Sequence, residues 1–250
     1  MDKPVKLNVI NATHLLIAMC IVTFLFEIFY NYVLGEAAFN NLFYTYGFSL
    51  ENILAGKLWV FITSIFLHAN AEHIVLNMIA LFFFGSAVEH EIGWKKTLLI
   101  FFVSAIVGNI AVIFATLVGI MPAAVPVVGA SAAIFGLLGA AMLVKPLEFM
   151  MFPYLVPVPL LLIALIYIFF NITEFAIVLF KGGVTDIAYV AHIGGLIAGM
   201  LFGFREEGKK KSLYVLLLIL AILIIVPFIL EFLKYIEIVN YASLVSQVFK

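Results

Sequence analysis

A long run without charged residues, from Thr97 to Val144, is the feature that most constrains the fold of this chain. A helix of about 20 residues crosses a bilayer core about 30 Å thick, so the run is divided into two predicted spans. The whole chain is 66% hydrophobic and 11% charged, whereas soluble domains are roughly 45–50% apolar and about 25% charged. The sequence therefore predicts a polytopic membrane protein.

Charged residues separate the apolar stretches and predict seven transmembrane helices. These spans are Thr13–Val33, His73–Val88, Lys96–Val118, Ser131–Val144, Pro153–Phe180, Asp186–Phe204 and Ser212–Leu233. Residues 34–72 combine scattered charges with many aromatic side chains and are predicted to rest in the membrane interface as a loop between the first two helices. We expect an all-α helix bundle forming one membrane domain over residues 1–250, with a six-helix core at 12–204 and a seventh helix at 212–233.

The basic residues are unequally divided between the two sides of this predicted bundle. With a cytoplasmic amino terminus, the cytoplasmic side carries nine of the 13 basic residues. The nine are Lys3, Lys6, Lys95, Lys96, Lys145, Arg205, Lys209, Lys210 and Lys211, and the other four are Lys57, Lys181, Lys234 and Lys250. Cytoplasmic loops are enriched in Lys and Arg, so we expect a multi-pass cell-membrane protein in this orientation. The net charge of −1 gives no indication of a nucleic-acid partner.

Four polar side chains within the spans fall at one depth in this orientation. His73 and Asn77 lie in the outer part of the second span, and Ser131 begins the fourth. His192 lies about six residues into the sixth span, or roughly 9 Å at 1.5 Å per residue. Polar groups are costly in hydrocarbon and normally face the bundle interior or a wet cavity. The four residues therefore predict one functional site that opens toward the extracytoplasmic side.

The fourth span is short, and this places Ser131 at a helix amino terminus below the membrane surface. About 14 residues give a helix of roughly 21 Å, less than a core of about 30 Å. The preceding stretch, Gly119–Val128, contains two prolines and is predicted to enter the membrane as irregular backbone, which requires surrounding protein or water. Free N–H groups at the start of the helix favour a developing negative charge beside Ser131.

Small residues predict that the fourth and sixth spans pack closely. Glycines recur every four residues in the sixth span, at 195, 199 and 203, and the fourth span has glycines at 136 and 139. Such an interface would bring Ser131 within hydrogen-bond reach of His192. A neutral imidazole could then take the serine proton as a general base. Asp2 and Asp186 are the only aspartates, and neither is placed as a third member, so the arrangement predicts a Ser–His dyad.

His73 and Asn77 lie four residues apart and therefore share one face of the second span. Side chains of this kind can donate hydrogen bonds to the oxyanion of a tetrahedral intermediate, together with the backbone N–H of Ser131. The sequence thus contains the parts needed for acyl transfer.

These residues resemble the motifs of the rhomboid family of intramembrane serine proteases, and the match runs from about Gly56 to Phe204. The matching segments are His68-Ala-Asn-Ala-Glu-His73-Ile-Val-Leu-Asn77, Gly129-Ala-Ser131-Ala with Phe135 and Gly136, and Ala191-His192-Ile-Gly-Gly195 through Gly199. Each segment alone is a weak signal, but the three together are specific.

The resemblance implies a six-helix rhomboid core with one added carboxy-terminal helix. It also implies that Ser131 is the nucleophile, that His192 is the base, and that His73, Asn77 and the Ser131 amide form the oxyanion hole. The expected activity is hydrolysis of peptide bonds in transmembrane protein substrates through an acyl-enzyme. The expected partners are those substrates and the lipid bilayer.

Supporting roles follow from the same resemblance. Gly129 would permit close approach at the nucleophile, Phe135 matches an aromatic residue that packs on the imidazole, and Glu89 matches an acidic residue near the cytoplasmic end of the second span. The family needs no metal and no small-molecule cofactor, so none is expected here.

Three further polar residues receive structural interpretations. Glu27 and Glu174 fall inside the first and fifth spans, where a carboxyl group is costly, and we interpret each as making a structural hydrogen bond. His68 is interpreted as an interfacial hydrogen-bonding residue.

The residues fit other functional classes less well. A metal-dependent intramembrane protease requires His-Glu-x-x-His, whereas His90-Glu91 is followed by Ile-Gly-Trp, and an aspartyl protease requires two intramembrane aspartates. A transporter should show inverted repeats or paired broken helices, although Glu27 is a hint toward one. A catalytically inactive adaptor of the same fold would usually lack the serine or the histidine. The adaptor and, after it, the transporter remain the alternatives to a protease.

Overall fold

The computed structural model describes residues 11–146, 149–152, 156–181, 189–208, 213, 214 and 217. The chain divides into two compact units, residues 1–208 and 209–250. Most of the predicted seventh helix, 212–233, lies outside the described residues. That helix and the single membrane domain over residues 1–250 therefore stay predictions.

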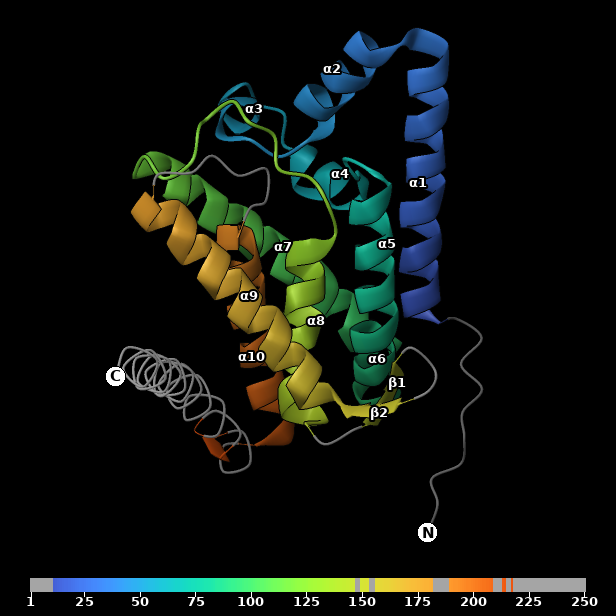
Figure 1. Ribbon diagram of the computed structural model, residues 1–250, viewed down its shortest axis with the longest axis vertical. Helices are drawn as coiled ribbons and strands as arrows, with labels where there is room; N and C mark the ends of the chain where they lie inside the picture. The colour runs from blue at the N-terminus through green and yellow to red at the C-terminus, as the bar shows by residue number, and fades with distance from the viewer. Residues whose placement is uncertain are drawn as a thin grey trace, which may run out of the picture. The chain divides into compact units, whose positions relative to one another are not determined.

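The first unit is built mainly of helices (Figure 1). The helices nearest to the predicted spans are α1 (Ala12–Leu34), α5 (Ala71–Ala80), α6 (Ser86–Ile92), α7 (Trp94–Leu117), α8 (Ser131–Val144), α9 (Leu160–Lys181) and α10 (Tyr189–Glu207). A π-helical turn, η1 (Leu81–Gly85), joins α5 to α6. In the described part of the chain, α1, the continuous helix 71–92 and α7 are long and apolar enough to cross a membrane, and α8 and residues 160–173 are shorter apolar helices. The prediction of a polytopic helical membrane bundle is confirmed.

A short β-hairpin, which the sequence analysis did not predict, precedes α9 and overlaps the start of the predicted fifth span. Strand β1 (Phe149–Phe152) pairs antiparallel with β2 (Val156–Pro159), and α9 begins only at Leu160. The prediction of a helix from Pro153 was therefore wrong. Proline lacks an N–H group and disfavours helical geometry in the residue before it, so the prolines at 157 and 159 keep this segment out of the helix.

Helix α8 lies at the centre of the first unit (Figure 1), and all of its residues from Ala132 to Val144 are buried. Its most extensive packing is against α10. A Cβ atom added at Gly195 would overlap the carbonyl oxygen of Ala132, and one added at Gly199 would overlap that of Gly136. The two backbones therefore touch, as small residues allow in membrane helices. The predicted close approach of the fourth and sixth spans is confirmed.

Three short helices form at the end of the bundle where α8 begins (Figure 1). They are α2 (Glu36–Tyr46), α3 (Leu50–Leu54) and α4 (Val60–Phe66). Residues 118–130 are irregular, as predicted, and hydrogen-bond to this segment. Phe48 and Val127 exchange backbone bonds of 2.9 and 2.7 Å, and Gly129 N donates to Ser64 O at 2.8 Å. These bonds fix the backbone that leads into Ser131 and satisfy polar groups that would otherwise be unpaired.

Two carboxylates bind α1 to the rest of the bundle. Glu89 accepts hydrogen bonds from the backbone N–H groups of Ala12 and Thr13, at 2.8 and 2.9 Å, and from the Thr13 hydroxyl at 2.7 Å. Glu89 thus caps the positive end of the α1 dipole. Glu27 is fully buried and accepts from the backbone N–H of His68. The structural interpretation of Glu27 is confirmed, whereas the side chain of Glu174 lies outside the described atoms.

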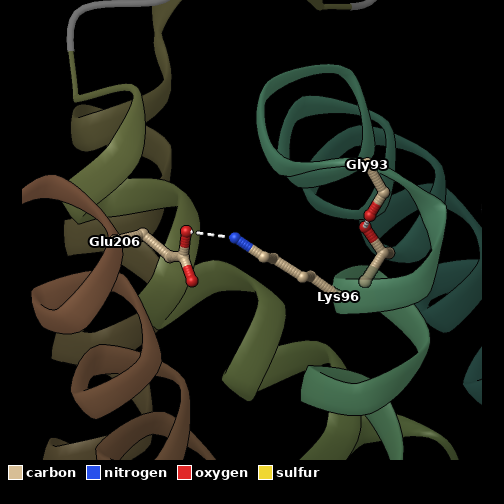
Figure 2. Close-up of polar contacts among 4 residues, drawn as sticks. Gly93, Lys96 and Glu206 are labelled. Atoms are coloured by element: carbon tan, nitrogen blue, oxygen red, sulfur yellow. Dashed lines mark hydrogen bonds and ion pairs between the residues drawn. The ribbon is translucent and has the colours of Figure 1, made fainter.

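Ion pairs gather at the end of α8 that lies away from Ser131. Lys96 at the start of α7 pairs with Glu206 near the end of α10 (Figure 2). Lys145, directly after α8, pairs with Glu91 of α6 at 3.4 Å. These charged residues lie at the end of the bundle that the sequence assigns to the cytoplasm, and the orientation itself stays a prediction.

The α8–α10 contact predicts a large cost for adding volume at Gly199. Because the new side chain would collide with the backbone of α8, Gly199→Val should lower the free energy of unfolding by about 2–3 kcal/mol. The matched control is Ile197→Val on the same helix, because Ile197 is 52% exposed and faces away from α8. Thermal unfolding in detergent measures both variants, and equal midpoints would contradict the described interface.

Candidate active site

Ser131 and His192 lie next to each other between α8 and α10. Ser131 is the first residue of α8 and is half-buried, and its hydroxyl oxygen lies 2.7 Å from Nε2 of His192. His192 is in the first turn of α10 and is 9% exposed. This distance is within the normal range for a hydrogen bond to a hydroxyl. The structure thus brings together the two residues that the sequence analysis had proposed as a pair, and the contact permits proton transfer from the hydroxyl to the imidazole.

Phe135, one turn after Ser131 on α8, packs on the imidazole. The Phe135 and His192 rings are stacked, with centroids 4.5 Å apart and planes inclined by 7°. The ring of Tyr189 approaches the same imidazole edge-on at 6.1 Å. These contacts hold the plane of the imidazole in a fixed orientation relative to the Ser131 hydroxyl.

Gly129 lies two residues before Ser131 and has a backbone conformation that favours glycine, with a φ of 116°. A Cβ atom at this position would lie 2.7 Å from Nε2 of His73 and 3.9 Å from Nδ2 of Asn77. The ring of His73 and the amide of Asn77 therefore converge on the backbone of residue 129. The sequence analysis had expected close approach at this glycine, and the structure assigns that approach to the two α5 side chains.

His73 and Asn77 lie one turn apart on α5. Asn77 is buried and donates one amide hydrogen to the His73 carbonyl oxygen at 2.8 Å, so its second amide hydrogen stays available. His73 lies in the first turn of α5, where the side chain of Asn70 accepts a hydrogen bond from its backbone N–H at 2.8 Å. The two side chains therefore offer hydrogen-bond donors beside the backbone that leads into Ser131.

His68 is buried and hydrogen-bonded, which agrees with its predicted hydrogen-bonding role, and its position in the membrane interface stays a prediction. Its exposure is 0%, and its Nδ1 lies 3.0 Å from the Phe66 carbonyl oxygen, to which only an N–H can donate. Burial, together with the nearby His73, lowers the pKa of His68 to about 4. His68 is therefore neutral at pH 7, and it packs against the ring of His73 at a centroid distance of 5.1 Å.

Asn171 of α9 is a site residue that the sequence analysis missed. Its Oδ1 lies 2.6 Å from Nδ1 of His192, and its Nδ2 donates to the backbone carbonyl oxygen of Tyr189 at 3.3 Å. The usual third member of such a site is a carboxylate, and neither Asp2 nor Asp186 is placed to serve as one. The sequence feature that could have identified Asn171 is that it is an uncharged amide within the apolar fifth span.

The fold and the site together define a class of protein. The first unit is a helical bundle with several membrane-length helices, and inside it a serine hydroxyl contacts a histidine imidazole supplied by a neighbouring helix. Such an arrangement is typical of a hydrolase that works within the membrane.

Comparison with known proteins gives the same class. The Rhomboid domain family model matches residues 55–209. Rhomboid protease GluP of Bacillus subtilis is 30% identical over 218 residues, which cover 84% of this chain and 39% of the relative. The putative rhomboid protease YdcA of the same bacterium is 30% identical over 171 residues, covering 67% and 76%. RHOMBOID-like protein 1 of Arabidopsis thaliana is 32% identical over 148 residues, covering 59% and 34%.

The chain belongs to the rhomboid family, a family of intramembrane serine proteases. It spans 39% of the length of GluP and 34% of the length of the Arabidopsis protein. The activity, substrates and partners of the whole chain are therefore matters for proposal and experiment.

Proposed function

We propose that this protein is an active intramembrane serine endopeptidase, with Ser131 as the nucleophile and His192 as the general base. The observation that carries the proposal is the 2.7 Å contact between the Ser131 hydroxyl and Nε2 of His192. An alcohol is a weak nucleophile at its own pKa and needs an adjacent base that can take its proton. The membership of the chain in a protease family supports the same assignment.

The reaction would proceed in two halves. The Ser131 oxygen attacks the scissile carbonyl carbon while its proton moves to Nε2 of His192. The tetrahedral intermediate then collapses, the C–N bond breaks, and His192 gives the proton to the departing amine. Water, activated by the same imidazole, hydrolyses the acyl-enzyme and regenerates the hydroxyl.

An oxyanion forms at the former carbonyl oxygen in each half of this reaction. We assign its stabilisation to the His73 imidazole, the Asn77 amide and the backbone N–H of Ser131. The convergence of His73 and Asn77 on Gly129 supports this assignment, because it places both side chains beside the backbone that precedes the nucleophile. The start of α8 adds the favourable end of a helix dipole.

The proposed substrates are transmembrane proteins that reach Ser131 within the bilayer. We further propose that the amino terminus is cytoplasmic and that the site opens toward the extracytoplasmic side, because the basic residues predict this orientation. An inactive adaptor is the alternative within the family, and it differs from the proposal only in the absence of catalysis.

The proposal predicts that Ser131→Ala and His192→Ala each abolish cleavage of a model transmembrane substrate by the reconstituted protein, because either change removes the nucleophile or its base. The matched control is Ser104→Ala. Ser104 is fully buried in α7, and its hydroxyl has no hydrogen-bond partner among the described residues. Ser104→Ala should retain wild-type cleavage. Persistent cleavage by either site variant would contradict the assigned roles, and no cleavage by folded wild-type protein with a range of substrates would favour the adaptor.

The oxyanion assignment predicts a different kinetic signature. His73→Ala and Asn77→Ala should each lower kcat by about 100- to 1,000-fold with a small change in KM, because their hydrogen bonds form only as charge develops in the transition state. Steady-state kinetics in detergent or proteoliposomes measure the two constants. A rise in KM at unchanged kcat would show that these residues bind substrate instead.

The orientation can be tested with single cysteines, because the one native cysteine, Cys20, is buried. In a Cys20→Ala background, Leu54→Cys in the exposed helix α3 should react with a membrane-impermeant maleimide added outside intact cells. Lys95→Cys at the start of α7 should react only after the cells are opened. The reverse pattern would overturn the proposed orientation.

A further inference from the structure

The Nδ1 side of the His192 imidazole is contacted by Asn171, which comes from α9 and not from the helices that carry Ser131 and the oxyanion donors. The distance from Oδ1 of Asn171 to Nδ1 is 2.6 Å, and the two side chains are 5% and 9% exposed. Buried polar groups that lie this close are hydrogen-bonded. The hydrogen of this bond lies either on Nδ1 of His192 or on the Asn171 amide, depending on which end of the amide faces the ring.

The backbone carbonyl of Tyr189 determines the orientation of the Asn171 amide. Nδ2 of Asn171 lies 3.3 Å from the Tyr189 carbonyl oxygen, and a carbonyl oxygen can only accept a hydrogen bond. The NH2 group of Asn171 must therefore face Tyr189, and Oδ1 must face His192. Because an amide oxygen also only accepts, the hydrogen belongs to Nδ1 of His192.

The opposite nitrogen follows directly, because a neutral imidazole carries one N–H. With the hydrogen on Nδ1, Nε2 presents its lone pair to the Ser131 hydroxyl at 2.7 Å. If the Asn171 amide were turned over, two acceptor oxygens would face each other at Tyr189. Its NH2 would then donate to Nδ1, and Nε2 would carry the hydrogen and be unable to accept the serine proton.

We propose that Asn171 is a positioning residue that holds His192 in the Nδ1–H tautomer, and that the Tyr189 carbonyl fixes the orientation of the Asn171 amide. The inference rests on the proposed function, because the tautomer matters only where His192 acts as a base. Asn171 also remains a hydrogen-bond acceptor for the imidazolium that forms when His192 takes the serine proton. A neutral amide does this without placing a charge in the membrane, where a carboxylate would be costly.

The direct test is ¹⁵N NMR of the full chain, labelled at the histidine ring nitrogens and held in detergent micelles. The ¹⁵N shift separates protonated from unprotonated ring nitrogens, and His192→Gln identifies the signals of His192. Wild-type protein should show the Nδ1–H tautomer, and Asn171→Leu should show a mixture that includes the Nε2–H tautomer. A wild-type Nε2–H tautomer, or an unchanged tautomer in Asn171→Leu, would overturn the proposal.

The kinetic test uses a matched control. Asn109 on α7 is also 5% exposed, and its amide contacts only the Phe61 carbonyl oxygen among its described partners. Asn171→Leu should lower kcat about 10- to 100-fold with little change in KM, because it removes a hydrogen bond to a group that becomes charged. Asn109→Leu should leave kcat near the wild-type value. Asn171→Asp keeps an acceptor oxygen for Nδ1 but loses the donor to the Tyr189 carbonyl and adds a costly carboxyl group, so it should restore only part of the lost rate.

The outcomes separate this inference from the proposed function. If wild-type protein does not cleave substrate, the proposed function fails, while the NMR result still decides whether Asn171 sets the tautomer. If wild-type protein cleaves but Asn171→Leu and Asn109→Leu have the same kcat, the positioning role fails and the protease assignment stands. Loss of folding in Asn171→Leu, seen as a lowered melting temperature, is distinguished by Asn171→Asp, which should recover part of kcat through its acceptor oxygen although it does not restore the contact with Tyr189.

Discussion

The site depends on the contact between the backbones of α8 and α10. Gly195 and Gly199 of α10 lie against the carbonyl groups of Ala132 and Gly136, and no other residue type leaves room for this approach. In a bilayer the hydrophobic effect contributes little to helix association, so the free energy of association has to come from close packing. The same contact determines how far Ser131 lies from His192, because both residues are within one turn of it. Stability and proposed catalysis therefore depend on the same small surface.

A second constraint is that the site has to use polar groups without exposing charge to the membrane. The side chains described around the Ser131–His192 contact are an amide, aromatic rings and the hydrogen-bond donors on α5, and none is a carboxylate. The chain does bury Glu27, but that carboxyl group is placed against the backbone N–H of His68 and binds α1 to the loop before α5. An asparagine at position 171 agrees with the absence of charged side chains at the site. Its amide oxygen accepts a hydrogen bond from His192 at a much lower desolvation cost than an aspartate would have.

Much of this arrangement could be predicted from the sequence, because the bilayer restricts both segment length and the placement of polar residues. The fourth span agrees with α8 at both ends, and the glycine repeats identified its contact with α10. The hairpin formed by β1 and β2 was missed because hydropathy does not distinguish a short apolar strand from the start of an apolar helix. Asn171 was missed because its partner is a ring nitrogen on another helix, and the hydropathy of α9 carries no information about which of its faces meets His192. The burial of His68 could not be predicted, because the sequence does not show that Glu27 of α1 accepts a hydrogen bond from its backbone.

Covalent labelling of the reconstituted wild-type protein with a fluorophosphonate, followed by mass spectrometry of its peptides, tests the central claim most directly. Such a probe reacts with a serine only when a neighbouring base activates the hydroxyl. The account predicts a single adduct on the peptide that contains Ser131, and loss of that adduct in His192→Ala. An adduct on another serine, or labelling of Ser131 that is unchanged in His192→Ala, would contradict it.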